Sequence, residues 1–215
     1  MRRVIYLSLV VAVWAVLPVL AQSLTLREAY EVALPVALEW NPKAGLYAAH
    51  SADWGKEDPN EGIDGKRYRW YIRFSFPEVV GLRNDKNKDS ESILFVEVID
   101  GKVADTFATK DSVLWSLIPA EEIPDTELIA NTAAKAGIKP SDEFAFGMHF
   151  SLYRNEDFYT TGNVMKDIPS KAVYLEVIGR RAPGTLPKEV EEAPGAAGLS
   201  YMYFAPQGKL LKEVN

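Results

Sequence analysis

The chain of 215 residues is 47% hydrophobic and 25% charged, contains no cysteine, and carries a formal net charge of −6. Its length fits one large domain or two small ones, and its hydrophobic fraction is too high for a disordered chain. The lack of cysteine excludes disulfides, thiolate metal sites and a cysteine nucleophile. The acidic balance argues against a nucleic-acid partner, because binding to phosphates requires positive charge.

The first 21 residues have the pattern of a secretory signal peptide. Arg2 and Arg3 precede an apolar run over residues 4–17, and small or modest side chains stand at positions −3 and −1 before a cleavage point after Ala21. An uncleaved anchor is the alternative, but the run is shorter than the roughly 20 residues that span a bilayer. We therefore expect cleavage, no membrane span in the mature chain, and a periplasmic or secreted protein.

Residues 24–40 are predicted to form a helix. Their apolar side chains recur at helical spacing, and Thr25 with Glu28 three residues later forms a capping box. Because a proline inside a helix costs about 3 kcal/mol, we expect the helix to be kinked or split at Pro35.

Four strands are predicted after this helix. The clearest one, residues 67–76, alternates aromatic and aliphatic side chains with arginines, a period of two. The strand at residues 92–99 is aliphatic on both faces and is expected to be central in the sheet. Asp100-Gly101 then predicts a type I′ turn, because both central residues of that turn need a positive φ. The four expected strands cover residues 44–54, 67–76, 92–99 and 102–107.

The second half repeats this order. A helix is predicted from Pro124 to Ala136, with Gly137 at its end. Strands are predicted at residues 144–152, 171–178, 199–205 and 209–214.

The predicted fold class is α+β, with two similar units that each pack a helix on an antiparallel sheet of three to four strands. The units cover residues 22–118 and 119–215, after the signal peptide at residues 1–21. They are either separate or share one continuous sheet. A chance likeness between the two halves is the alternative to a duplication.

A family resemblance follows from this layout. A helix with an alanine-rich face at residues 129–137 precedes antiparallel strands and a terminal hairpin that continues through Gly208-Lys209-Leu210. This arrangement resembles a PepSY-type domain, and the two halves would then be two such domains in tandem. The resemblance implies an extracytoplasmic protein concerned with propeptides, peptidase regulation or sensing, and it carries over no catalytic residue. The aromatic strand at residues 144–152 and the long loops depart from the family pattern.

Motifs for nucleophilic catalysis, phosphate binding and zinc peptidases are absent from the sequence. Its two histidines, His50 and His149, have no second ligand at zinc spacing; we expect His50 to be half-buried and His149 to lie on the sheet surface. Asp85, Asn87 and Asp89 alternate as in a calcium loop, but the glycine and glutamate of an EF-hand are missing, which favours a solvated connection. We therefore expect no cofactor and no metal.

The arginine-rich strand offers the most usable surface. Arg67, Arg69 and Arg73, with Tyr71 between them, are predicted to line one strand face. Because arginine and tyrosine are enriched at interfaces, this face is a candidate docking surface for an acidic peptide or ligand. Pairing with carboxylates such as Glu97 on a neighbouring strand is the favoured alternative. Two tryptophans are further candidates for a lid or groove, although tryptophan is more often core: Trp54 and Trp115.

The expected function is non-catalytic binding outside the cytoplasm, in which a sheet face or a groove between the units docks or regulates a protein or peptide partner. A carrier that holds an apolar or aromatic ligand between helix and sheet is the second hypothesis. A carboxylate-dependent hydrolase is the third, which buried carboxylates with raised pKa values would support.

Overall fold

The fold is known from a computed structural model. It describes residues 22–51, 62–80, 91–111, 113, 116–139, 148–155, 168–181 and 199–214. Several predicted features lie outside the described residues: the signal peptide at 1–21, Trp54, Trp115, and the loop with Asp85, Asn87 and Asp89.

Helix α1, Leu26–Trp40, begins as the sequence predicts. The Thr25 hydroxyl accepts a hydrogen bond from the Glu28 N–H, and the Glu28 carboxylate accepts one from the Thr25 N–H at 2.8 Å. The helix is continuous through Pro35, so of the two expected outcomes, a kink or a split, the split does not occur. Pro35 is exposed, where the carbonyl that loses its hydrogen bond can be solvated, while the opposite side of the helix packs on the sheet and stabilises it.

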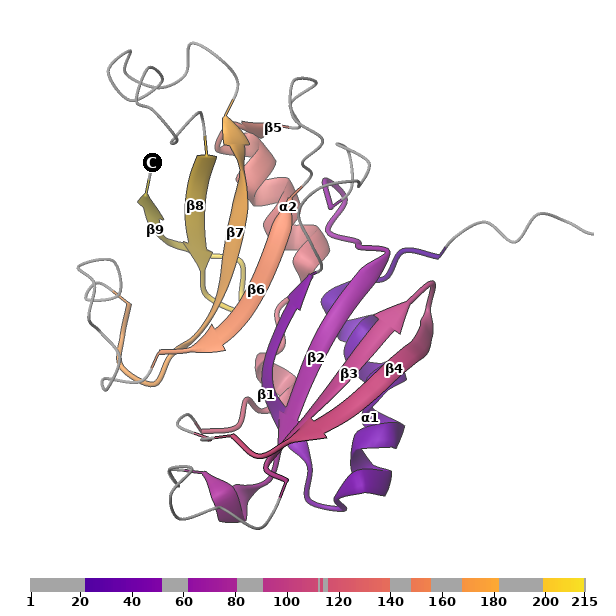
Figure 1. Ribbon diagram of the computed structural model, residues 1–215. Coiled ribbons are helices and arrows are strands. Elements are labelled where there is room, and N and C mark those ends of the chain that lie inside the picture. Colours follow the sequence, from indigo (N-terminus) through magenta and orange to yellow (C-terminus); the bar gives the residue numbers. More distant parts are fainter. Residues whose placement is uncertain are drawn as a thin grey trace, which may run out of the picture.

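One antiparallel sheet contains all the strands of the described residues. Its order is β4-β3-β2-β1-β6-β7-β8-β9, and the short β5 pairs with β7. Each side of the sheet therefore runs outward in chain order from the central β1–β6 pair (Figure 1). The strands are β1 Gly45–Ser51, β2 Arg69–Ser75, β3 Ile93–Ile99, β4 Lys102–Thr109, β5 Ile138–Lys139, β6 His149–Arg154, β7 Val173–Arg181, β8 Leu199–Phe204 and β9 Leu210–Val214.

Both helices pack on the same face of this sheet. Helix α1 contacts β2, β3 and β4, while α2, Thr126–Lys135, contacts β5. One cluster of buried side chains joins the two helices to strands from both halves of the chain. Within it, the ring of Trp70 in β2 lies 6.1 Å from that of Phe150 in β6. The α+β fold is therefore confirmed, but the sheet is larger than the three to four strands predicted for each unit, because β1 and β6 join the halves.

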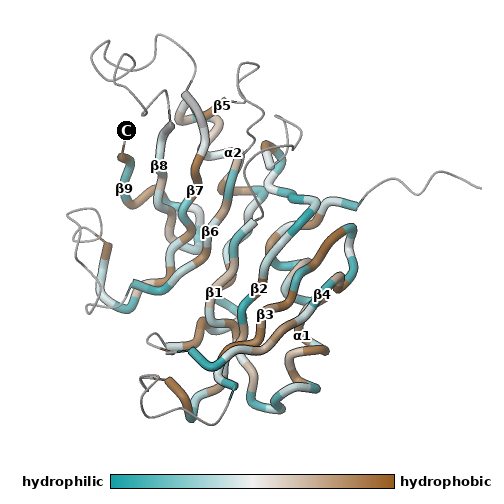
Figure 2. The backbone as a smooth tube through the Cα atoms, viewed as in Figure 1, coloured by the Kyte–Doolittle hydropathy of each residue, from teal (hydrophilic) through white to brown (hydrophobic). Residues whose placement is uncertain are grey.

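The hairpin of β3 and β4 has the predicted turn. Asp100 and Gly101 have φ angles of 52° and 69°, as a type I′ turn requires. Strand β3 is hydrophobic along most of its length (Figure 2) and has a strand on each side, although it lies one strand from the edge rather than at the centre.

In the part of the chain that the structure describes, the remaining helical segments are two short 3₁₀ turns, η1 Pro77–Val79 and η2 Ala120–Glu122. Residues 81–90, between η1 and β3, are not among the described residues, whereas η2 leads into α2 after three residues. Among the described helices, none has the length and apolar character that crossing a membrane requires.

Candidate functional site

The sheet face opposite the helices, called the open face below, carries a row of polar side chains that crosses all eight strands of the main sheet. Each member of the row stands directly opposite the next in the strand register. Because side chains alternate along a strand, these residues share one face. From β4 to β9 the polar row consists of Asp105, Glu97, Tyr71, His50, Ser151, Glu176, Tyr203 and Lys212.

Two of the three predicted arginines lie on the open face, on either side of Tyr71. The Nε of Arg69 lies 3.4 Å from Oε1 of Glu97 on β3. This is the cross-strand pairing that the sequence favours. Both side chains are partly exposed, so the pair contributes about 0–1 kcal/mol to stability and leaves little net charge for an acidic ligand.

The second arginine backs an aromatic stack. The guanidinium carbon of Arg73 lies 5.0 Å from the centre of the Phe95 ring. The Phe95 ring stacks on that of Phe107, with centroids 4.5 Å apart and planes inclined by 7°. The Nε of Arg73 is buried and has no hydrogen-bond partner in the described part of the chain. Phe107, on the edge strand β4, is 55% exposed, so the stack ends in an apolar ring that faces water.

Arg67 is not on this surface, which corrects its predicted place. The residue is 1% exposed and lies before β2 begins. Its backbone exchanges hydrogen bonds with Leu24, at 2.9 and 2.8 Å, and its Nη1 donates to the Met148 carbonyl at 3.0 Å. The strict alternation of β2 therefore does not extend back to this position, and the guanidinium links the entry to β2 with the start of β6.

His149 lies beside Arg67 and is also buried, not on the sheet surface as expected. Its Nδ1 is 3.4 Å from Oγ of Ser51, and that oxygen accepts a hydrogen bond from the Phe150 N–H at 3.1 Å. Burial, followed by the charges of Arg67 and His50, lowers the pKa of His149 from 6.5 to about 4. A neutral imidazole is therefore held at the contact between β1 and β6 at neutral pH.

A tyrosine-rich end of the open face was not anticipated from the sequence. The Tyr174 ring lies 5.9 Å from the rings of both Tyr153 and Tyr203. Beside them, burial raises the pKa of Glu176, and a hydrogen bond from Tyr203 opposes that shift. Across the strands Glu176 faces Ser151 and Tyr203, so no carboxylate stands directly opposite it in the described strands. The period of two in β7 and β8 is the signal that could have revealed this cluster.

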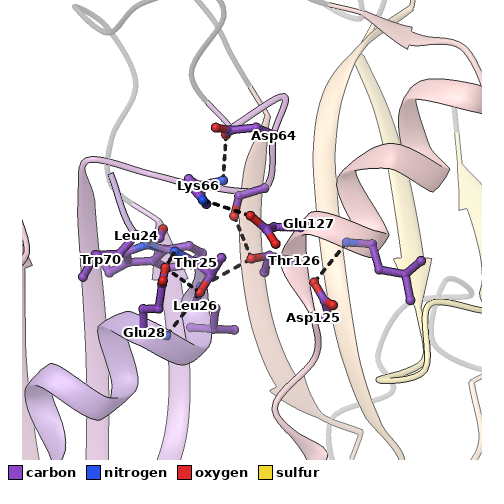
Figure 3. A network of polar contacts seen from close by, with 12 residues as sticks. Leu24, Thr25, Leu26, Glu28, Asp64, Lys66, Trp70, Asp125, Thr126 and Glu127 are labelled. Carbon is purple, nitrogen blue, oxygen red and sulfur yellow. Dashed lines mark hydrogen bonds and ion pairs between the residues drawn. The ribbon is translucent and has the colours of Figure 1, made fainter. Parts of the chain in front are cut away.

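The first turns of α1 and α2 meet at a polar cleft of about 330 Å³ (Figure 3). Thr25 caps α1 and Asp125 caps α2, so each cap already occupies an N–H group of its own first turn. The Nζ of Lys66 lies 3.0 Å from Oε1 of Glu127. Because the groups that line the cleft bind one another, the cleft is better suited to joining the two halves than to holding a ligand.

Within the ranges that the structure describes, no cluster of three or more His, Asp or Glu side chains is placed to hold a metal ion. A scan against protein-family models, a search of curated proteins and a search of solved structures each gave no match to this chain.

Proposed function

We propose that the protein is an extracytoplasmic, non-catalytic binding protein that docks a protein or peptide partner on the open face of its sheet, around Arg69, Tyr71 and Arg73. The observation that carries this proposal is the accessible part of the open face. Both helices pack on the opposite face. Tyr174 and Tyr203 are buried at one end of the open face, whereas Phe107 at the other end is 55% exposed beside the charged and aromatic side chains of β2 and β3. Arginine and aromatic side chains dominate the buried centres of protein interfaces, which supports a docking role.

The packing between helices and sheet favours docking over the carrier hypothesis. Leu26 and Ala33 of α1, and Trp70, Ile72 and Phe74 of β2, are each 0–1% exposed and belong to one cluster. An apolar ligand in this layer would have to displace well-packed side chains, at a cost of several kcal/mol. A partner on the open face displaces water.

The order of elements supports an organisation in two similar units, residues 22–118 and 119–215. The first residues of the two helices, Leu26 and Thr126, lie 100 positions apart in sequence, and the Leu26 N–H donates to Thr126 Oγ1 at 3.4 Å. Each helix is followed by four strands of the main sheet that run outward from its centre. We infer that the units are two PepSY-like domains in tandem, exported through the signal peptide at residues 1–21.

A double substitution tests the docking surface. The variant with Arg69→Ser and Arg73→Ser is expected to lose capture of the partner while the Tm changes little. The partly exposed Arg69–Glu97 ion pair contributes about 0–1 kcal/mol, and the contact of Arg73 with the Phe95 ring contributes about 0.5–1 kcal/mol. Capture is measured by pull-down from the native envelope fraction with identification of the bound protein, and Tm by circular dichroism. Arg67 stays unchanged in this test because it is buried.

The matched control is Lys43→Ser, which removes another surface cation that pairs with a carboxylate, Glu78, beyond the end of β2 and outside the polar row. This variant is expected to retain the partner. Loss of folding in the double variant, or full capture by a folded double variant, would contradict the proposed surface.

A further inference from the structure

We propose that the partner binds as an extended segment that adds a strand to the free edge of β4, with an aromatic side chain over Phe107 and a cationic side chain opposite Asp105. The inference rests on the proposed function and deepens it, because it names the mode of binding and the side chains that are recognised. Three observations carry it: the exposure of the edge strand, the end of the aromatic stack and the charge at the end of the polar row.

Strand β4 is a long and exposed edge. It has eight residues, pairs only with β3 among the described strands, and is exposed at each position from 104 to 107. The outward backbone groups of an edge strand are a template for an added strand. The opposite edge, β9, has five residues, of which only the first is exposed. Of the two edges, β4 therefore offers the longer and more accessible template.

The aromatic stack ends at this edge. Arg73, Phe95 and Phe107 stand directly opposite one another on β2, β3 and β4. A strand added beyond β4 would place one side chain directly opposite Phe107, with the two Cβ atoms about 4.5–5.5 Å apart. An aromatic side chain there would continue the stack and cover the ring that now faces water.

The charge at the end of the polar row specifies a second side chain. Asp105 stands directly opposite Glu97, and like charges in that position are destabilising. Glu97 is neutralised by Arg69, whereas Asp105 has no ion pair within the described ranges. A lysine or arginine opposite Asp105 would supply the missing charge, and a cationic segment also suits a chain of net charge −6.

The spacing of the two contacts sets a motif. Phe107 and Asp105 lie two residues apart on one face, so the partner must present its aromatic and cationic side chains two residues apart. In an antiparallel addition, which matches every pairing in the main sheet, the partner reads aromatic, any residue, then lysine or arginine. The middle residue points to the helix side, opposite Thr106.

The test uses a fluorescein-labelled peptide of seven residues with the core Phe-Thr-Lys, titrated with the mature protein and followed by fluorescence anisotropy. We expect binding that weakens about tenfold or more with Phe107→Ser, since an aromatic pair and the buried ring area are lost. Asp105→Lys is expected to weaken binding of the same peptide and to strengthen binding of a peptide in which glutamate replaces the lysine. The peptide with N-methylated backbone amides on the pairing side is expected not to bind.

The control is Leu128→Ser, which removes a 48% exposed apolar side chain on α2, away from β4, and is expected to leave the affinity unchanged. The inference would be overturned if the peptide does not bind, or if its affinity is unchanged by both Phe107→Ser and N-methylation. It would also be overturned if sedimentation velocity shows that the protein is a dimer paired through β4. If the peptide fails while the arginine double variant still loses the natural partner, the docking surface stands and only strand addition is wrong. If neither effect is seen, the proposed function fails as well.

Discussion

Replacing Gly65 with alanine is expected to destabilise the protein by more than about 3 kcal/mol, enough to leave a marginal domain unfolded. Gly65 has a φ of 80°, and an added Cβ would lie 2.3 Å from the Thr126 carbonyl oxygen and 2.5 Å from the Glu127 nitrogen. These are backbone atoms at the start of α2, so they cannot move aside as a side chain would. The Thr126 hydroxyl also donates to the Gly65 carbonyl at 2.6 Å, which fixes the close approach.

The matched control is Gly101→Ala in the β3–β4 turn. Gly101 also has a positive φ, 69°, but its added Cβ would meet the side chain of Gln22, with Oε1 at 2.7 Å. That side chain is flexible and can move aside. The free energy of unfolding is therefore expected to fall by only about 1–2 kcal/mol, the cost of placing alanine in the left-handed region. Urea unfolding followed by circular dichroism measures both variants. Equal losses would show that the turn around Gly65 does not pack against α2, and would contradict the described join between the halves.

The contribution of His149 to the free energy of unfolding is expected to fall by about 3 kcal/mol as the pH decreases from about 6.5 to about 4. The pKa of His149 is about 4 in the folded protein, compared with its ordinary value of 6.5. Between these two values the unfolded chain binds a proton that the folded chain does not, which favours unfolding as the pH falls. The Arg67 charge beside the buried ring adds to this cost of protonation. Urea unfolding at a series of pH values measures the effect.

The variant His149→Asn is expected to flatten this pH dependence, whereas His50→Asn, at a partly exposed position on the open face, is expected to leave most of it in place. Glu176 acts in the opposite direction. Burial raises its pKa above 4.5, so its contribution to stability is present at low pH and is lost as the pH rises through the raised pKa. The variant Glu176→Gln removes the contribution of Glu176 to the pH dependence of stability and leaves that of His149. A pH profile of wild-type shape in His149→Asn would contradict the burial of this ring.

Features set by neighbouring residues were predictable from the sequence. The capping box of Thr25 and Glu28, the turn at Asp100-Gly101 and the burial of alternate residues in β2 all follow from local backbone chemistry, and the structure confirms them. Sequence periodicity also places Arg69 and Arg73 together on the open face, because it needs only the alternation of a single strand.

Features set by distant contacts were not predictable. His50 pairs with Ser151 across the β1–β6 contact, and no local pattern encodes a pairing over such a separation. Arg67 was misplaced because the alternation was continued two residues beyond the start of β2, where the chain instead pairs with Leu24. The pairing of Glu176 with Tyr203 likewise needs the register of β7 and β8.

Hydrogen–deuterium exchange of the protein, alone and bound to any partner that it captures from a native envelope fraction, tests the proposed docking surface most directly. If the partner docks on the open face and the β4 edge, backbone amides of β3 and β4, residues 93–109, will exchange more slowly in the complex. The first turns of α1 and α2, which line the polar cleft, will exchange at the same rate in both states. Protection of residues 25–31 and 124–127 with no change in β4 would place the partner in the cleft and contradict the account.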